Sequence, residues 1–150
     1  MDILVVDLTH TAQTISSDFM PYGAALVASY TDRHTPFHTD IRVIKSPDQL
    51  ESEFKLKKPQ IIGFSCYMWN ADLSLRIAEK IKLEAPEVTI IFGGPDFPVD
   101  ISRQEQWLRT NSHVDFFIPF EGELPFHGIV SALHELDGDL IAAKEQRIRG

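Results

Sequence analysis

Short apolar segments alternate along the chain with segments of helical periodicity, and this alternation is the strongest constraint on the fold. Runs such as residues 3–7 and 88–92 are β-branched or aliphatic on both faces, which is typical of strands buried in a parallel sheet. Three similar segments complete the strand set, over residues 40–44, 61–65 and 114–118. Strands that alternate with helices predict a parallel sheet with helices on both faces and right-handed crossovers.

The segments between the strands carry signals that begin helices. Pro21 opens a helix predicted over residues 21–30, because its missing N–H has no partner in a first turn. Ser46 can cap a second helix, and Asn70 can cap a third that runs to about residue 85. Two more helices are predicted over residues 101–109 and 124–136.

The fold class that follows is α/β. We expect a three-layer, Rossmann-like (flavodoxin-like) domain with five parallel strands in the order 2-1-3-4-5. A chain of 150 residues is long enough for one such domain. We place the domain in residues 1–138. The charged segment 139–150, which lacks a helix stop or a further strand, is expected to begin a linker to a downstream domain.

Charge and cysteine content exclude several classes of protein. The chain has 14 Lys and Arg against 22 Asp and Glu, a net charge of −8, which argues against nucleic acid or an anionic membrane as a partner. Its single cysteine, Cys66, rules out an internal disulfide. The first residues have no basic region followed by a long apolar stretch, so we expect a cytoplasmic protein without a membrane span.

Ligands of such sheets bind outside the carboxyl ends of the strands, so the residues that follow each strand are the informative ones. Residues 8–11 lack the glycine-rich fingerprint of a dinucleotide site, and no phosphate-binding loop with its lysine is present. A phospho-acceptor receiver domain is rejected because Ser65 and Pro119 stand where an aspartate and a lysine would be needed. What remains at these positions is a set of glycines, hydroxyls and large apolar side chains.

Together these residues resemble the N-terminal cobalamin-binding domain of B12-dependent radical SAM proteins. The matching elements are Ile61–Ser65 followed by Asn70 and a helix, Ile90–Pro95 with its Gly-Gly pair, and Val114-Asp115 followed by Glu121-Gly122-Glu123. Residues 20–23 match the Pro-x-Gly motif that precedes the first helix of that family. The resemblance covers nearly the whole chain, and the Gly-Gly and Glu-Gly-Glu elements in this order are fairly specific.

The resemblance implies that a corrin ring lies across the carboxyl edge of the sheet and that its nucleotide tail enters the crevice below. Gly93 and Gly94 would leave room for the tail, and Ser65 would offer a hydroxyl to a ring nitrogen or phosphate. Large side chains such as Trp69 would pack on the macrocycle. The candidate cofactor-binding residues are Thr9, Met20, Pro21, Tyr22, Gly23, Ser65, Tyr67, Met68, Trp69, Asn70, Gly93, Gly94, Pro95, Glu121, Gly122 and Glu123.

One departure concerns the cobalt ligand. In the related methionine-synthase type of domain, a D-x-H-x-x-G motif brings a histidine to cobalt. The nearest match here is Asp18–Gly23, with Met20 in place of the histidine, and a thioether is a weak ligand compared with imidazole. We therefore expect base-off cobalamin, with its own tail base away from cobalt and no histidine bound to the metal. His10 is the one histidine in the corresponding loop.

The chemistry of such a protein would lie outside these residues. A radical SAM domain needs three cysteines for its [4Fe-4S] cluster, so the cluster and S-adenosylmethionine are expected in a downstream domain, which is also the expected partner. We assign this segment no catalytic residue and no protein metal site, since His127 and His134 lack a third ligand in register. The alternative is a regulatory or interaction domain that no longer binds cobalamin, its crevice filled by Tyr67 and Trp69.

Overall fold

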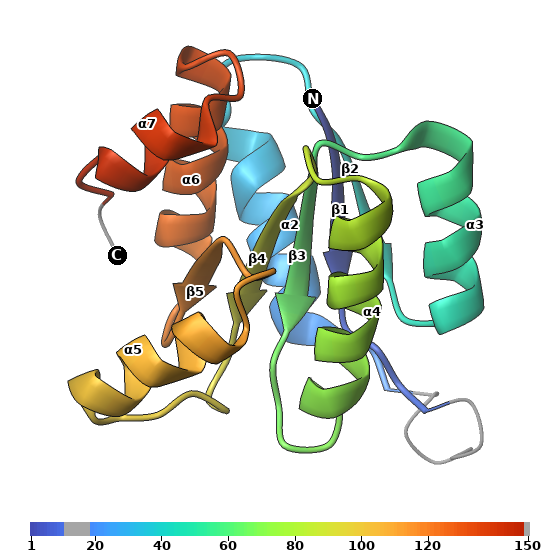
Figure 1. The fold of residues 1–150 in the computed structure, drawn as a ribbon. Helices are drawn as coiled ribbons and strands as arrows, with labels where there is room; N and C mark the ends of the chain where they lie inside the picture. The colour runs from blue at the N-terminus through green and yellow to red at the C-terminus, as the bar shows by residue number, and fades with distance from the viewer. Residues whose placement is uncertain (11–18, 149–150) are drawn as a thin grey trace.

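The computed structural model describes residues 1–10 and 19–148 and contains a five-stranded parallel sheet. The strands are β1 (Asp2–Val6), β2 (Asp40–Ile44), β3 (Ile61–Ser65), β4 (Thr89–Gly93) and β5 (Phe116–Ile118). Their order is β2-β1-β3-β4-β5, and each neighbouring pair runs parallel, so the carboxyl ends meet at one edge (Figure 1). The order expected from the sequence is confirmed.

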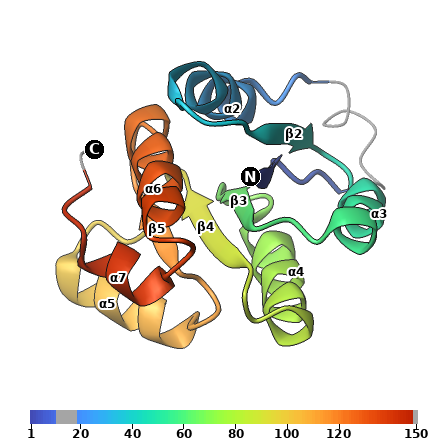
Figure 2. The ribbon, with the colours of Figure 1, turned by 90° about the horizontal axis from the view of Figure 1, so that it is seen from above.

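Helices cover both faces of the sheet, as Figure 2 shows from above. Helices α2 (Tyr22–His34) and α6 (Glu123–Glu135) lie against one face, and α3 (Pro47–Lys57) and α4 (Ala71–Glu84) against the other. Helix α5 (Ile101–Thr110) lies on the same face as α3 and α4, because its Trp107 packs against the buried apolar side chains on that side of the sheet. The result is the expected three-layer arrangement.

The alternation of side chains in the strands divides the core between the two faces. In β1, Ile3 and Val5 point toward α2 and α6, while Leu4 and Val6 point toward α3 and α4. All four side chains are buried, because the central strand is covered on both sides. Figure 1 shows β1, β3 and β4 in the middle of the molecule.

Two of the expected helix caps behave differently. The Ser46 side chain accepts a hydrogen bond from the Gln49 backbone N–H at 3.4 Å and so caps α3 as expected. Asn70 occupies the N-cap position of α4, but its side chain makes no cap hydrogen bond and is fully buried. The cap expected from Asn70 is therefore wrong, because the amide is used in a polar network inside the sheet edge.

The segment after residue 138 contains a helix that its sequence pattern does not predict. Helix α7 (Leu140–Glu145) is capped by the Asp139 side chain, which accepts from two backbone N–H groups. Its Ala143 is fully buried against the α2 and α6 cluster, and Lys144 lies 3.4 Å from the Asp115 carboxylate. Residues 139–145 thus pack on the domain rather than leave it; with six residues, α7 was too short to show a periodicity.

Within residues 1–10 and 19–148, the helices are all too short or too polar to cross a bilayer.

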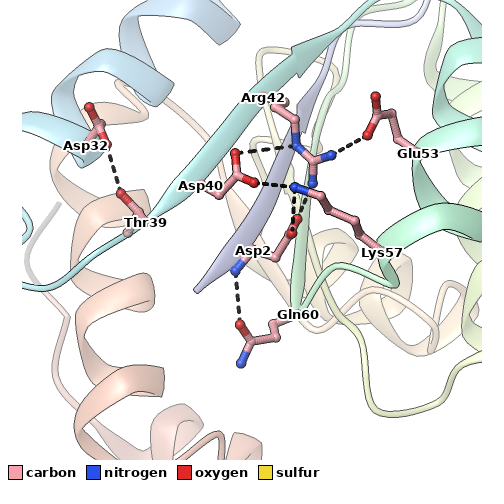
Figure 3. A network of polar contacts seen from close by, with 8 residues as sticks. All are labelled: Asp2, Asp32, Thr39, Asp40, Arg42, Glu53, Lys57 and Gln60. Carbon is pink, nitrogen blue, oxygen red and sulfur yellow. Dashed lines mark hydrogen bonds and ion pairs between the residues drawn. The ribbon is translucent and has the colours of Figure 1, made fainter.

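The outer strand β2 is held by a charged network at the amino end of the sheet (Figure 3). Arg42 on β2 contacts Asp2 of β1 and Glu53 of α3, and its Nε lies 3.7 Å from Asp40. Lys57 donates to Asp40 at 2.7 Å, and this hydrogen bond holds the pKa of the Asp40 carboxyl below its usual value. Charges on an edge strand also discourage pairing with another sheet.

We expect Arg42→Ala to lower the free energy of unfolding by about 1–2 kcal/mol, because three carboxylates then lose a shared, half-buried cation. Urea titration followed by circular dichroism measures this. Arg76→Ala is the matched control: Arg76 pairs with Asp72 across an exposed helix turn, and its removal should change the free energy by less than about 0.5 kcal/mol. Equal effects of the two variants would contradict the structural role of the network.

Candidate functional site

A cavity of about 160 Å³, here called the slot, opens at the carboxyl edge of the sheet. Its floor is formed by β1, β3 and β4, and its walls by the first turns of α2 and α6. The lining is mostly apolar and includes five glycines, Gly23, Gly63, Gly93, Gly94 and Gly122. A cavity of this size is known to accept a single aromatic ring in other proteins. The arrangement therefore suits a flat, mainly apolar group that enters from the sheet edge.

Polar side chains gather where β1 and β3 end. The Ser65 hydroxyl donates to the Asp7 carboxylate at 2.5 Å, and the Asn70 side-chain N–H₂ lies 3.2 Å from the same Asp7 oxygen, from Ser65 Oγ and from the Leu8 carbonyl. Asn70 Oδ1 accepts from the Tyr67 backbone N–H at 2.9 Å. Asp7, Ser65 and Tyr67 line the slot, while Asn70 lies buried behind it. The amide of Asn70 thus ties the ends of two strands together.

The adjacent residues Gly93 and Gly94 differ in whether the backbone conformation requires glycine. A side chain on Gly93 would meet Ile118 at 3.6 Å or more, an ordinary contact, so the fold itself tolerates one there. Gly94 has φ +138°, and a Cβ atom would lie 2.5 Å from the Cys66 carbonyl oxygen. Gly94 is therefore required by the turn that ends β4. Gly93 instead keeps the slot open, since it faces α2 and α6 like Ile91 two residues earlier.

Exposed apolar side chains surround the mouth of the slot. Phe120 is 83% exposed although it also lines the slot, and Met68 is 84% exposed. Trp69 stacks on Tyr67 with ring centroids 4.6 Å apart and planes almost parallel. Large apolar side chains left exposed next to a cavity are typical of a binding surface.

The structure brings about half of the predicted site residues into the slot. Gly23, Ser65, Tyr67, Gly93, Gly94, Gly122 and Glu123 line it. Eight others lie outside its lining, at or near the same edge: Thr9, Met20, Pro21, Tyr22, Met68, Trp69, Pro95 and Glu121. Asp18, the first residue of the motif that includes Met20, lies outside the described residues. Asn70, predicted to touch the cofactor, is buried beneath the slot wall.

Asp7, Gly63 and Phe126 also line the slot, although the sequence does not mark them as site residues. The sequence pattern predicts Asp7 as the last residue of the first strand, whereas in the structure it follows β1 and lines the slot. A charged residue at the end of an apolar strand is the signal that could have found it. Gly63 lies in the middle of β3, and a Cβ atom there would come within 2.7 Å of the Phe126 ring. This packing of Phe126 on Gly63 forms the deep part of the slot, and no local sequence pattern reveals it.

Ser65 lines the slot, and its hydroxyl already has a hydrogen-bond partner there. The sequence suggested that its hydroxyl would be offered to a ring nitrogen or phosphate, but its proton is donated to Asp7. The slot is nevertheless open. Trp69 does not line it and Tyr67 forms part of its wall, so these two residues do not fill the crevice.

Cys66 and the paired histidines add no reactive centre. Cys66 is fully buried, and burial, assisted by the nearby Asp96 charge, raises the pKa of its thiol to about 12. A neutral buried thiol is a packing group rather than a nucleophile. His127 lies within hydrogen-bond range of Ser131, whereas His134 stacks on Phe37. Among the described residues, no group of three or more His, Cys, Asp and Glu side chains could hold a metal ion.

Comparison with known proteins gives a consistent result. Residues 9–130 match the profile of the B12 binding domain. The cobalamin-dependent radical SAM methyltransferase TokK of Streptomyces tokunonensis is 25% identical over 123 residues, which are 75% of this chain and 17% of that protein. A 2-(S-pantetheinyl)-carbapenam-3-carboxylate methyltransferase of Streptantibioticus cattleyicolor is 25% identical over 122 residues, with the same coverage.

A solved structure shares the fold. A cobalamin-binding protein from Desulfitobacterium hafniense superimposes with a TM-score of 0.55 and 18% identity, over 81% of this chain and 54% of that one. The chain spans about one sixth of the length of the two curated relatives, and the matched profile covers most of it. The resemblance inferred from the sequence is confirmed: this chain belongs to the B12 binding domain family.

Proposed function

We propose that this domain holds cobalamin base-off, with the nucleotide tail inserted into the slot and the corrin ring over the carboxyl edge of the sheet. The observation that carries the proposal is the open slot beside Gly93, at a position where the fold would tolerate a side chain. A glycine that the fold does not require indicates that the space it leaves is used. The mainly apolar lining suits an aromatic heterocycle.

The residues around the mouth would hold the corrin ring. Met68, Phe120 and the Tyr67–Trp69 stack offer apolar surface to one face of a large macrocycle. Met20 is 72% exposed in the segment before α2, where related domains carry a histidine. His10 has its Nε2 3.1 Å from the Trp69 carbonyl. These features support cobalamin without a histidine ligand on cobalt.

The chemistry belongs to a longer protein. We infer a B12-dependent radical SAM protein, whose downstream domain supplies the [4Fe-4S] cluster and S-adenosylmethionine, because both curated relatives are methyltransferases and are matched over 17% of their length. Bound cobalamin would supply a cobalt centre that carries the group to be transferred. The present residues would bind and orient the cofactor, while the exposed apolar rim would also receive the downstream domain.

The experiment that tests this proposal is a titration of the purified protein with hydroxocobalamin, followed by desalting and a visible absorption spectrum. We expect the protein to retain corrin with a base-off spectrum. The base of the nucleotide tail would lie in the slot and would therefore not coordinate cobalt. A base-on spectrum would contradict insertion of the tail. Failure of both this chain and a longer form carrying the downstream domain to retain corrin would favour a regulatory or interaction domain without cofactor.

A further inference from the structure

The polar groups at the edge of the slot form a network whose proton directions can be assigned. Asn70 Oδ1 faces the Tyr67 backbone N–H, so its amide nitrogen must face the Leu8 carbonyl and the Asp7 carboxylate. This fixes the orientation of the amide, since a flipped Asn70 would place a donor against a donor. The Asn70 amide nitrogen also lies 3.2 Å from Ser65 Oγ, which can accept from it.

The position of the Ser65 proton follows from this arrangement. An ionised carboxylate accepts hydrogen bonds and donates none, so the short contact between Ser65 Oγ and Asp7 Oδ1 must use the single hydroxyl proton of Ser65. Asp7 Oδ1 then receives protons from both Ser65 and Asn70. Two hydrogen-bond acceptors then remain for a molecule in the slot. One is a lone pair on the Ser65 hydroxyl, and the other is the second carboxylate oxygen of Asp7.

The charges that line the slot agree with this picture. Asp7 follows β1 and Glu123 opens α6, and they are the charged residues of the slot lining. Two carboxylates repel a phosphate and favour a group that is neutral or positively charged. Tyr67, whose hydroxyl faces Gly23 of α2, also lines the slot and can donate or accept.

From these observations we infer that Asp7 is a specificity-determining residue: it holds Ser65 as an acceptor, so the polar edge of the slot selects a ligand group that donates a hydrogen bond. The inference rests on the proposed function and assigns the donor to the nucleotide tail of cobalamin, through a protonated ring nitrogen or a sugar hydroxyl. The phosphate of the tail would stay outside the slot, away from Asp7 and Glu123.

The variant Asp7→Asn tests whether the slot prefers a ligand group that donates a hydrogen bond over one that accepts it. Because Ser65 and Asn70 both donate to Oδ1, the carbonyl oxygen of the new amide must take that place, and its N–H₂ group replaces the second carboxylate oxygen. The shape of the slot is kept, but an acceptor becomes a donor. We expect affinity for hydroxocobalamin to fall about tenfold or more, whereas affinity for cobinamide, which lacks the nucleotide tail, should be unchanged.

Further variants complete the design. Ser65→Ala should also weaken hydroxocobalamin selectively, by removing one acceptor. Asp96→Asn, at an exposed carboxylate of the same edge that does not line the slot, is the matched control and should bind like the wild type. Tyr67→Phe measures what the remaining hydroxyl contributes, and thermal unfolding of every variant reports whether the domain is folded.

The outcomes separate the inference from the proposed function. Equal or tighter binding of hydroxocobalamin by folded Asp7→Asn would overturn the donor preference, because it would mean that the ligand presents an acceptor. An equal loss for cobinamide would overturn the assignment to the tail. If the wild-type protein binds neither corrinoid, the proposed function itself fails.

Discussion

Replacing Gly93 with leucine should abolish retention of cobalamin while leaving the domain folded. The Gly93 position faces α2 and α6 at the end of β4, and the added side chain would fill the cavity of about 160 Å³ between the sheet and these helices. The contacts of a Cβ atom with Ile118, at 3.6 and 3.7 Å, are ordinary, so the backbone need not move. We expect the dissociation constant for hydroxocobalamin to rise at least about 100-fold.

Binding and folding are measured separately in this experiment. Corrin retained after desalting reports binding, and the thermal midpoint reports folding, which should change by only a few degrees. Asp96→Leu places the same side chain three residues later, at an exposed position outside the slot lining, and should retain the cofactor. If Gly93→Leu binds cobalamin as well as the wild type does, the tail does not enter this slot.

Gly94→Ala should have the opposite effect and destabilise the fold itself. The backbone of Gly94 has φ +138°, and a Cβ atom would lie 2.5 Å from the Cys66 carbonyl oxygen and 3.1 Å from the Cys66 nitrogen. Both contacts are with backbone atoms of the neighbouring strand end, which cannot rotate away. We expect a loss of about 3 kcal/mol or more in the free energy of unfolding, which is a large part of the stability of a small domain.

Urea unfolding of Gly94→Ala beside Gly93→Ala gives the comparison. The two variants add the same methyl group to adjacent residues. A difference between their free energies of unfolding therefore reflects the backbone conformation at each position and not the added methyl group itself. Gly93→Ala should remain close to the wild type in stability. A Gly94→Ala domain as stable as Gly93→Ala would show that the turn after β4 can relax, and Gly94 would then have to be explained by the ligand.

The strand order could be predicted from the sequence because the signals that set it are local. Each strand has its own apolar run, and helix starts such as Ser46-Pro47 lie between the runs. Chirality rules then leave few ways to connect five parallel strands. Helix α7 was missed for the complementary reason: in six residues it is stabilised by the Asp139 cap and by contacts of Ala143 and Lys144 with distant parts of the chain.

The candidate site was predicted in outline but not in its chemistry. The sequence alone determined which residues follow the strands, and parallel strands must bring those residues to one edge. It could not distinguish Gly93 from Gly94, because the difference is whether a Cβ atom would clash with the Cys66 backbone or make ordinary contacts with Ile118.

Only the tertiary structure showed that Asp7 takes the Ser65 proton, that Asn70 is buried rather than a helix cap, and that Gly63 makes room for Phe126. Each of these facts depends on atoms brought together from residues 58 or more positions apart. Periodicity and caps are properties of neighbours along the chain, whereas the direction of a proton and the shape of a cavity are properties of neighbours in space.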